Sequence, residues 1–172
     1  MIQIRNGVFE TNSSSSHSIV ISKQSTPADV SNSWYIDDDG VINIDEYETE
    51  FNWGVAILAD WYHRMLYALA SLGEKYIDEI GEAVQKHFPN FKGFDFKFDT
   101  SYLSVDHQSV GILRSAMSKY CFSVEDFIFD DRYLVFVDHD NHEIIVNSLL
   151  RHNIIHKEDV DVYPCEEEED DE

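Results

Sequence analysis

The chain has 172 residues, 43% hydrophobic and 13% aromatic, and this composition excludes a disordered acidic protein. Its net charge of −22, from 34 acidic and 12 basic residues, argues against direct nucleic-acid binding unless metal ions bridge the contact, because such binding requires Lys or Arg to neutralise phosphates. No apolar run approaches the ~20 residues that span a membrane, and Met1–Val8 is too polar for a signal peptide, so we expect a cytoplasmic protein.

The first part of the chain predicts short strands. Met1–Phe9 and Ile19–Ile21 have the loose alternation and β-branched residues of strands. Trp34–Ile36 and Val41–Ile44 flank the sequence Asp-Asp-Gly at residues 38–40, which is typical of a hairpin turn. We therefore expect a hairpin here.

After residue 51 the apolar spacing changes from two residues to three and four, which predicts a helical hairpin. Asn52 is a candidate cap for a helix over Trp53–Leu72, and Gly73 is a candidate helix stop. A second helix is predicted over Glu74–His87. The apolar positions on one face of the first helix are Val55, Leu58, Tyr62, Met65, Leu69 and Leu72.

The rest of the chain predicts further mixed structure. Phe91–Phe98 alternates as a strand, and Val110–Tyr120 has helical spacing. Ser123 and the acids after it resemble a helix cap, with the helix ending near Phe129. Strand-like segments follow at Tyr133–Val137 and Glu143–Asn147.

Together these elements predict one α+β domain over residues 1–164. We expect a mostly antiparallel sheet packed against the helical hairpin. Residues 165–172 are expected to form a disordered acidic tail, because like charges without apolar anchors do not offset the entropy of ordering. Ten acids and Lys157 give residues 157–172 a charge of −9, so the body still holds −13.

A serine-rich block stands between the first two predicted strands. Residues 5–18 read Arg-Asn-Gly-Val-Phe-Glu-Thr-Asn-Ser-Ser-Ser-Ser-His-Ser. Hydroxyls and loop N–H groups can hold a phosphate or carboxylate, and a histidine can act as acid, base or ligand. The alternative is a turn whose hydroxyls satisfy their own backbone. The candidate catalytic residues of the block are Ser13, Ser14, Ser15, Ser16 and His17.

This block resembles the N-terminus of a group of uncharacterised proteins of bacteriophages and prophages. The sequence Asp-His-Gln-Ser at residues 106–109 is similar to a downstream segment of the same group. The resemblance implies a phage gene product that acts in the host bacterial cytoplasm. It implies no fold, reaction or site residue.

The acidic body favours a non-enzymatic binder. An acidic surface attracts basic proteins and can occupy a groove built for phosphates. We therefore expect an inhibitor that mimics DNA and binds a basic, nucleic-acid-handling host protein, without a cofactor. Solubility alone is the simpler explanation of the charge. The candidate binding residues are Asp37, Asp38, Asp39, Asp45, Glu46, Glu48 and Glu50.

The alternative hypothesis is an enzyme or a metal-binding protein that combines the serine block with two other polar segments. Asp106 and His107 precede a predicted helix, and residues 138–142 form a predicted turn. Asp and His at short spacing suit a divalent metal, although turns also use such residues. The candidate metal ligands are His17, Asp106, His107, Asp138, His139 and Asp140. This site requires three separate loops to meet, so the sequence favours the binder.

Overall fold

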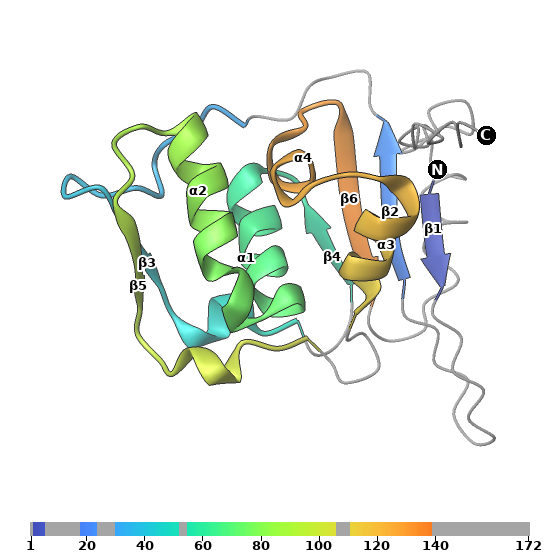
Figure 1. Ribbon diagram of the computed structural model, residues 1–172, viewed down its shortest axis with the longest axis horizontal. Helices are drawn as coiled ribbons and strands as arrows, with labels where there is room; N and C mark the ends of the chain where they lie inside the picture. The colour runs from blue at the N-terminus through green and yellow to red at the C-terminus, as the bar shows by residue number, and fades with distance from the viewer. Residues whose placement is uncertain (1, 6–17, 24–29, 52–54, 106–110, 139–172) are drawn as a thin grey trace, which may run out of the picture.

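A computed structural model describes residues 2–5, 18–23, 30–51, 55–105 and 111–138 (Figure 1). These residues form a mixed α+β fold, and α1 and α2 lie between a four-stranded and a two-stranded sheet. The predicted strand Glu143–Asn147 and the acidic tail lie outside the described residues. The elements are β1 (Ile2–Arg5), β2 (Ser18–Lys23), β3 (Val41–Ile44), η1 (Glu46–Thr49), β4 (Val55–Leu58), α1 (Trp61–Leu72), η2 (Glu74–Tyr76), α2 (Ile77–His87), β5 (Gly93–Phe96), η3 (Thr100–Tyr102), α3 (Ile112–Tyr120), α4 (Val124–Phe129) and β6 (Tyr133–Asp138).

The larger sheet has the strand order β1-β2-β6-β4, and each neighbouring pair is antiparallel. β6 therefore lies between β2 and β4 and is hydrogen-bonded to both. Alternate residues along β6, Val135 and Val137, are fully buried, as are Ile19 of β2 and Leu58 of β4. The strands predicted around residues 2, 19 and 133 are all present in this sheet.

The smaller sheet pairs β3 with β5 in parallel, with Val41 opposite Gly93 and Ile44 opposite Phe96. This parallel pair is the exception to the expected, mostly antiparallel pairing, which the three antiparallel pairs of the larger sheet follow. The reason is the connection: the chain between the two strands carries β4, α1 and α2. Such a long crossover returns the chain in its original direction, whereas a short turn would reverse it.

The prediction of a hairpin around residues 38–40 is correct for its turn and its second strand, but wrong for its first strand. Val41–Ile44 is a strand, but Trp34–Ile36 is a turn in which the Ile36 amide donates to the Ser33 carbonyl at 3.0 Å. The predicted turn is present, since the Gly40 amide donates to the Asp37 carbonyl at 2.9 Å. The turn therefore leads into β3 without a paired strand before it.

The helix predicted to begin at Trp53 begins eight residues later. Val55–Leu58 forms β4, the edge partner of β6, and α1 starts at Trp61. The cap is Asp60, whose carboxylate accepts a hydrogen bond from the His63 amide at 2.9 Å. A run of four consecutive apolar residues suits a strand as well as a helix, and β6 supplies the strand partner.

The rest of the helical hairpin is confirmed. α1 ends at Gly73, which has φ 77° and donates its amide to the Leu69 carbonyl. Every α1 residue except His63 is buried, so this helix forms the centre of the core. α2 is amphipathic: it buries Ile80 and Val84 and exposes its acidic residues. The predicted cap of α4 is also present, because Ser123 and Asp126 form a reciprocal capping box.

Candidate functional site

Charge is distributed unevenly over the described residues. Residues 30–51 and 74–105, here called the acidic half, carry thirteen acidic and four basic side chains, a net charge of −9. The other described residues, here called the neutral half, carry six of each sign. In Figure 1 the acidic half includes β3, β5 and α2 on the left, and the neutral half includes the four-stranded sheet on the right.

The turn before β3 uses one of its three consecutive aspartates for structure. The Asp37 carboxylate accepts hydrogen bonds from the Asp39 amide at 3.0 Å, the Val41 amide at 2.8 Å and Asn43 Nδ2 at 3.1 Å. The bond from Val41 is the main cause that holds the pKa of Asp37 below its ordinary value. Asp38 and Asp39 are exposed and project from the turn into solvent.

At the other end of β3, Glu48 is also engaged within the protein. One of its carboxylate oxygens accepts from the Asp45 amide at 2.9 Å, and the other accepts from the Tyr62 hydroxyl at 3.0 Å. Asp45, Glu46 and Glu50 are exposed. Of the seven predicted binding residues, Asp37 and Glu48 thus accept hydrogen bonds within the protein, and all except Glu48 are exposed.

Exposed aromatic side chains accompany these carboxylates, and the sequence analysis did not identify them. Trp34 is 87% exposed, Tyr47 72% and Tyr102 68%, and all three belong to the acidic half. In the described residues, only Ile57 is also a large, exposed apolar side chain. Exposed aromatics are enriched at protein interfaces. Their sequence signal is weak: Tyr47 stands between two glutamates, and Trp34 belongs to an apolar run that predicts a strand rather than an exposed side chain.

A cluster at the start of α1 joins the two halves. The ring of Tyr35 stacks on that of Tyr62, with centroids 3.8 Å apart and an interplanar angle of 3°. The Tyr35 hydroxyl donates to one oxygen of Asp60 at 3.2 Å, and the other oxygen lies 2.7 Å from Nδ1 of the half-exposed His63. The cluster thus fixes the segment before β3 against the helix.

The ionisation of this cluster follows from its contacts. The hydrogen bond to Asp60 raises the pKa of His63. Burial would raise the pKa of Asp60, but the hydrogen bonds from His63 bring it below its ordinary value. Burial, reinforced by Glu48, raises the pKa of Tyr62. An imidazole paired with a carboxylate can accept a proton, but both groups also form the helix cap, which is a sufficient reason for the pair.

The residues of the alternative site lie mostly outside the described residues. These are Ser13, Ser14, Ser15, Ser16, His17, Asp106, His107, His139 and Asp140. Only the backbone of Asp138 is described. Among the described residues, no group of three or more His, Cys, Asp or Glu side chains is close enough to hold a metal ion.

The described residues that border the serine block and residues 139–142 nevertheless meet at one end of the larger sheet. Arg5 is opposite Ser18, Ser18 is opposite Asp138, and Asp138 is opposite Val55. Antiparallel neighbours are about 4.5–5.5 Å apart at Cα. A bridge between Phe51 and Val105 lies four residues before Val55 in the chain. The serine block, residues 106–109 and residues 139–142 therefore all adjoin this row or this bridge.

No helix in the described part of the chain is long and apolar enough to cross a membrane. Comparison with family models, with curated proteins and with solved structures finds no match to this chain.

Proposed function

We propose that this chain is a phage-encoded inhibitor that binds a basic, nucleic-acid-handling protein of the bacterial host cytoplasm through its acidic half. The observation that carries the proposal is the separation of charge among the described residues, −9 in one half against zero in the other. Solubility alone requires no such separation, because charges spread over the whole surface serve it equally well. A one-sided charge instead orients a basic partner as it approaches.

The exposed carboxylates form two groups at opposite ends of β3. Asp38 and Asp39 precede the strand, and Asp45 and Glu46 follow it. Asp39 and Asp45 are six residues apart, and six residues at ~3.3 Å each separate the two groups by at most roughly 20 Å. This exceeds the Debye length of about 8 Å at physiological salt, so each group attracts charge independently. A partner that spans both groups replaces phosphate contacts with carboxylate contacts along its nucleic-acid groove.

The aromatic side chains supply the short-range part of the interface. Trp34 lies three residues before the aspartate turn, and Tyr47 follows Glu46 directly. Large aromatic residues surrounded by charge are typical of binding hot spots, because they bury apolar area at low entropic cost. Charge then sets the rate of association, and the aromatics set the rate of dissociation.

The test is affinity capture from a bacterial lysate at low salt, followed by kinetics with the purified partner. We expect a basic nucleic-acid-handling protein that duplex DNA displaces and whose activity on DNA the chain inhibits. Neutralising Asp38, Asp39, Asp45 and Glu46 together should slow association at least ~10-fold. The single variants Asp38→Asn and Asp131→Asn form a matched pair, because each removes one negative charge. Asp38→Asn in the acidic half should slow association, and Asp131→Asn in the neutral half should leave the association rate unchanged. Capture of a partner that duplex DNA does not displace would contradict the proposal. So would an equal decrease in association rate for variants of the acidic and of the neutral half.

A second candidate is the enzyme or metal-binding function of the sequence analysis. The row from Arg5 to Val55 favours it, since it brings the borders of the serine block and of residues 139–142 together at one end of the sheet. A divalent ion that binds the folded state should raise the melting temperature by mass action. His107→Ala should abolish the shift, and His63→Ala should not. Absence of a shift with Mg²⁺, Mn²⁺ and Zn²⁺ would count against this function.

A further inference from the structure

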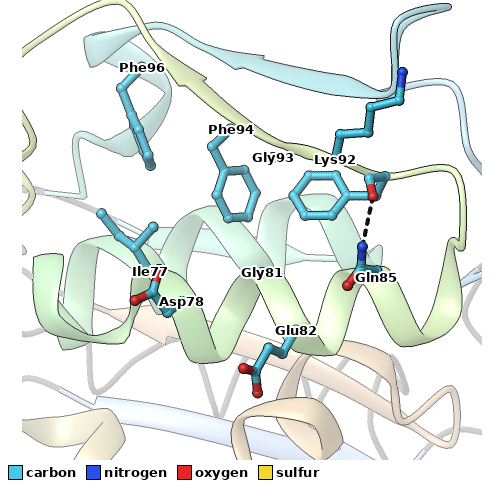
Figure 2. Close-up of a pocket in the computed structure, with 10 residues that line it drawn as sticks. Ile77, Asp78, Gly81, Glu82, Gln85, Lys92, Gly93, Phe94 and Phe96 are labelled. Atoms are coloured by element: carbon cyan, nitrogen blue, oxygen red, sulfur yellow. Dashed lines mark hydrogen bonds between the residues drawn. The ribbon is translucent and has the colours of Figure 1, made fainter.

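A groove of about 400 Å³ runs between α2 and the segment that leads into and forms β5 (Figure 2). Its apolar wall includes Ile77 of α2 and Phe94 of β5, and Asp78 and Glu82 of α2 contribute carboxylates. The volume is near the lower end of the roughly 300–1,000 Å³ typical of ligand pockets. It accommodates one long side chain with part of its backbone rather than a whole element of secondary structure.

The groove exists partly because residue 81 of α2 is glycine. A Cβ there would lie 3.6 Å from Cε2 of Phe94 and 3.8 Å from Cε1 of Phe91, which is ordinary van der Waals contact. A longer side chain at this position would extend past those atoms into the groove. The rings of Phe91, which is buried, and Phe94 have centroids 4.9 Å apart and are tilted by 57°, and both lie opposite the glycine.

The two carboxylates pair with no cation in the described part of the chain. Asp78 and Glu82 are one helical turn apart and exposed, and neither forms an ion pair with any described residue. Lys92 also lines the groove, but Figure 2 shows its side chain extending away from α2, with its ammonium beyond the β5 segment. An apolar, aromatic wall is thus combined with unneutralised negative charge.

We propose that this groove accepts an arginine side chain of the basic partner, an inference that rests on the proposed function. A guanidinium has a flat, weakly hydrated face that stacks on an aromatic ring, and N–H donors at its edge that bind carboxylates. Phe94 supplies the ring and Asp78 supplies a carboxylate. The Glu82 side chain, which Figure 2 shows extending to the side of α2 away from the β5 segment, adds negative charge at the rim of the groove. A lysine can pair with the carboxylates but has no flat face to stack on the ring. An aliphatic side chain can pack against the apolar wall but leaves the carboxylates unpaired.

The test uses three synthetic twelve-residue peptides in which glycine alternates with arginine, with lysine or with citrulline. Citrulline keeps the shape of arginine without its charge. Binding to the full chain is measured by fluorescence anisotropy, and the binding position by NMR shifts of Gly81 and Phe94. We expect the arginine peptide to shift both residues and to bind at least threefold more tightly than the lysine peptide. The citrulline peptide should bind at least tenfold more weakly than the arginine peptide.

Variants of the groove residues distinguish binding of the peptide in the groove from binding elsewhere on the acidic half. Gly81→Leu fills the groove and should weaken the arginine peptide at least fivefold, whereas Gly81→Ala, the matched control, should change its affinity less than twofold. Asp78→Asn with Glu82→Gln should also weaken it at least fivefold, and these exposed changes keep the test valid if Gly81→Leu unfolds. The inference would be overturned if the arginine peptide bound the Gly81→Leu variant as tightly as the original chain. It would also be overturned if the citrulline peptide bound as tightly as the arginine peptide. If only neutralisation of Asp38 and Asp39 weakens binding, the groove is excluded while the proposed function stands.

Discussion

Arg64 and Asp130 are joined by a hydrogen bond of 2.7 Å from Nη1 of the guanidinium to the backbone carbonyl oxygen. Arg64 lies in the middle of the core with no exposed surface, and its Nε donates to the Leu58 carbonyl at 3.3 Å. One side chain of α1 therefore donates hydrogen bonds to two backbone carbonyl groups, one at the end of β4 and one directly after α4. Buried carbonyl groups require such partners, because water does not reach them.

Replacing Arg64 with Met should lower the free energy of unfolding by about 2–4 kcal/mol, since it leaves two carbonyl groups without this donor. The change is measured by urea denaturation. Arg132 is the matched control because its guanidinium also contacts Asp130, but through the carboxylate and at an exposed position. Arg132→Met should cost less than about 1 kcal/mol. Equal costs for the two variants would contradict the structural role of Arg64.

Two glycines should respond to alanine with opposite signs. Gly81→Ala should raise the free energy of unfolding by about 0.5–1 kcal/mol, because α2 has room for the methyl group and alanine favours helix. Gly40→Ala should lower it by about 1–3 kcal/mol, because φ is +84° and a Cβ would lie 2.3 Å from the Asn90 carbonyl oxygen. Thermal or urea denaturation measures both. A gain at Gly40 would show that the turn differs from the one described.

Asp60→Asn should lower the pKa of His63 toward its ordinary value of about 6.5. The carboxylate raises the pKa of His63, so the pair stabilises the fold below pH 6.5, and this contribution is lost as pH rises through the folded pKa. Asparagine still caps a helix, so the variant removes charge while it retains the cap. NMR titration of the histidines measures the shift, with His87 as an internal reference. An unchanged pKa of His63 would mean that the ion pair is absent in solution.

Tyr67→Phe should make the fold less sensitive to alkaline pH. Tyr67 is fully buried, and burial raises the pKa of its hydroxyl to about 12. The unfolded chain therefore loses this proton first, and the fold loses stability as pH rises above 10. The expected loss is about 1 kcal/mol at pH 11, and the Phe variant should lack it. Urea denaturation at pH 8 and pH 11 provides the comparison, and parallel losses in both proteins would contradict the prediction.

Local patterns in the sequence predict much of this fold. The helical hairpin, the stop at Gly73 and the cap at Ser123 depend on apolar spacing and on side chains within one turn. The strand at Val55–Leu58 was not predicted, because its strand state depends on pairing with β6, about eighty residues later. The parallel pairing of β3 with β5 depends likewise on a crossover that no local pattern encodes.

The candidate site was predictable only in part. Counting charges along the chain identified the acidic segments, but it did not show that Asp37 and Glu48 are hydrogen-bonded within the protein. The separation of charge into two halves needs the fold, because the acidic half joins two segments that are distant in sequence. The groove beside Gly81 could not be predicted from the sequence either, because its walls come from α2 and from β5, which pack together only in the fold.

The position of β6 in the centre of the larger sheet has a consequence for how the protein is made. The ribosome delivers β1, β2 and β4 well before β6, at about 5–20 residues per second. Until residues 133–138 emerge, β2 and β4 each present an unpaired edge where β6 belongs, and unpaired edges promote aggregation. Translation that stops before residue 133 thus leaves the sheet in two parts, β1 with β2 on one side and β4 on the other.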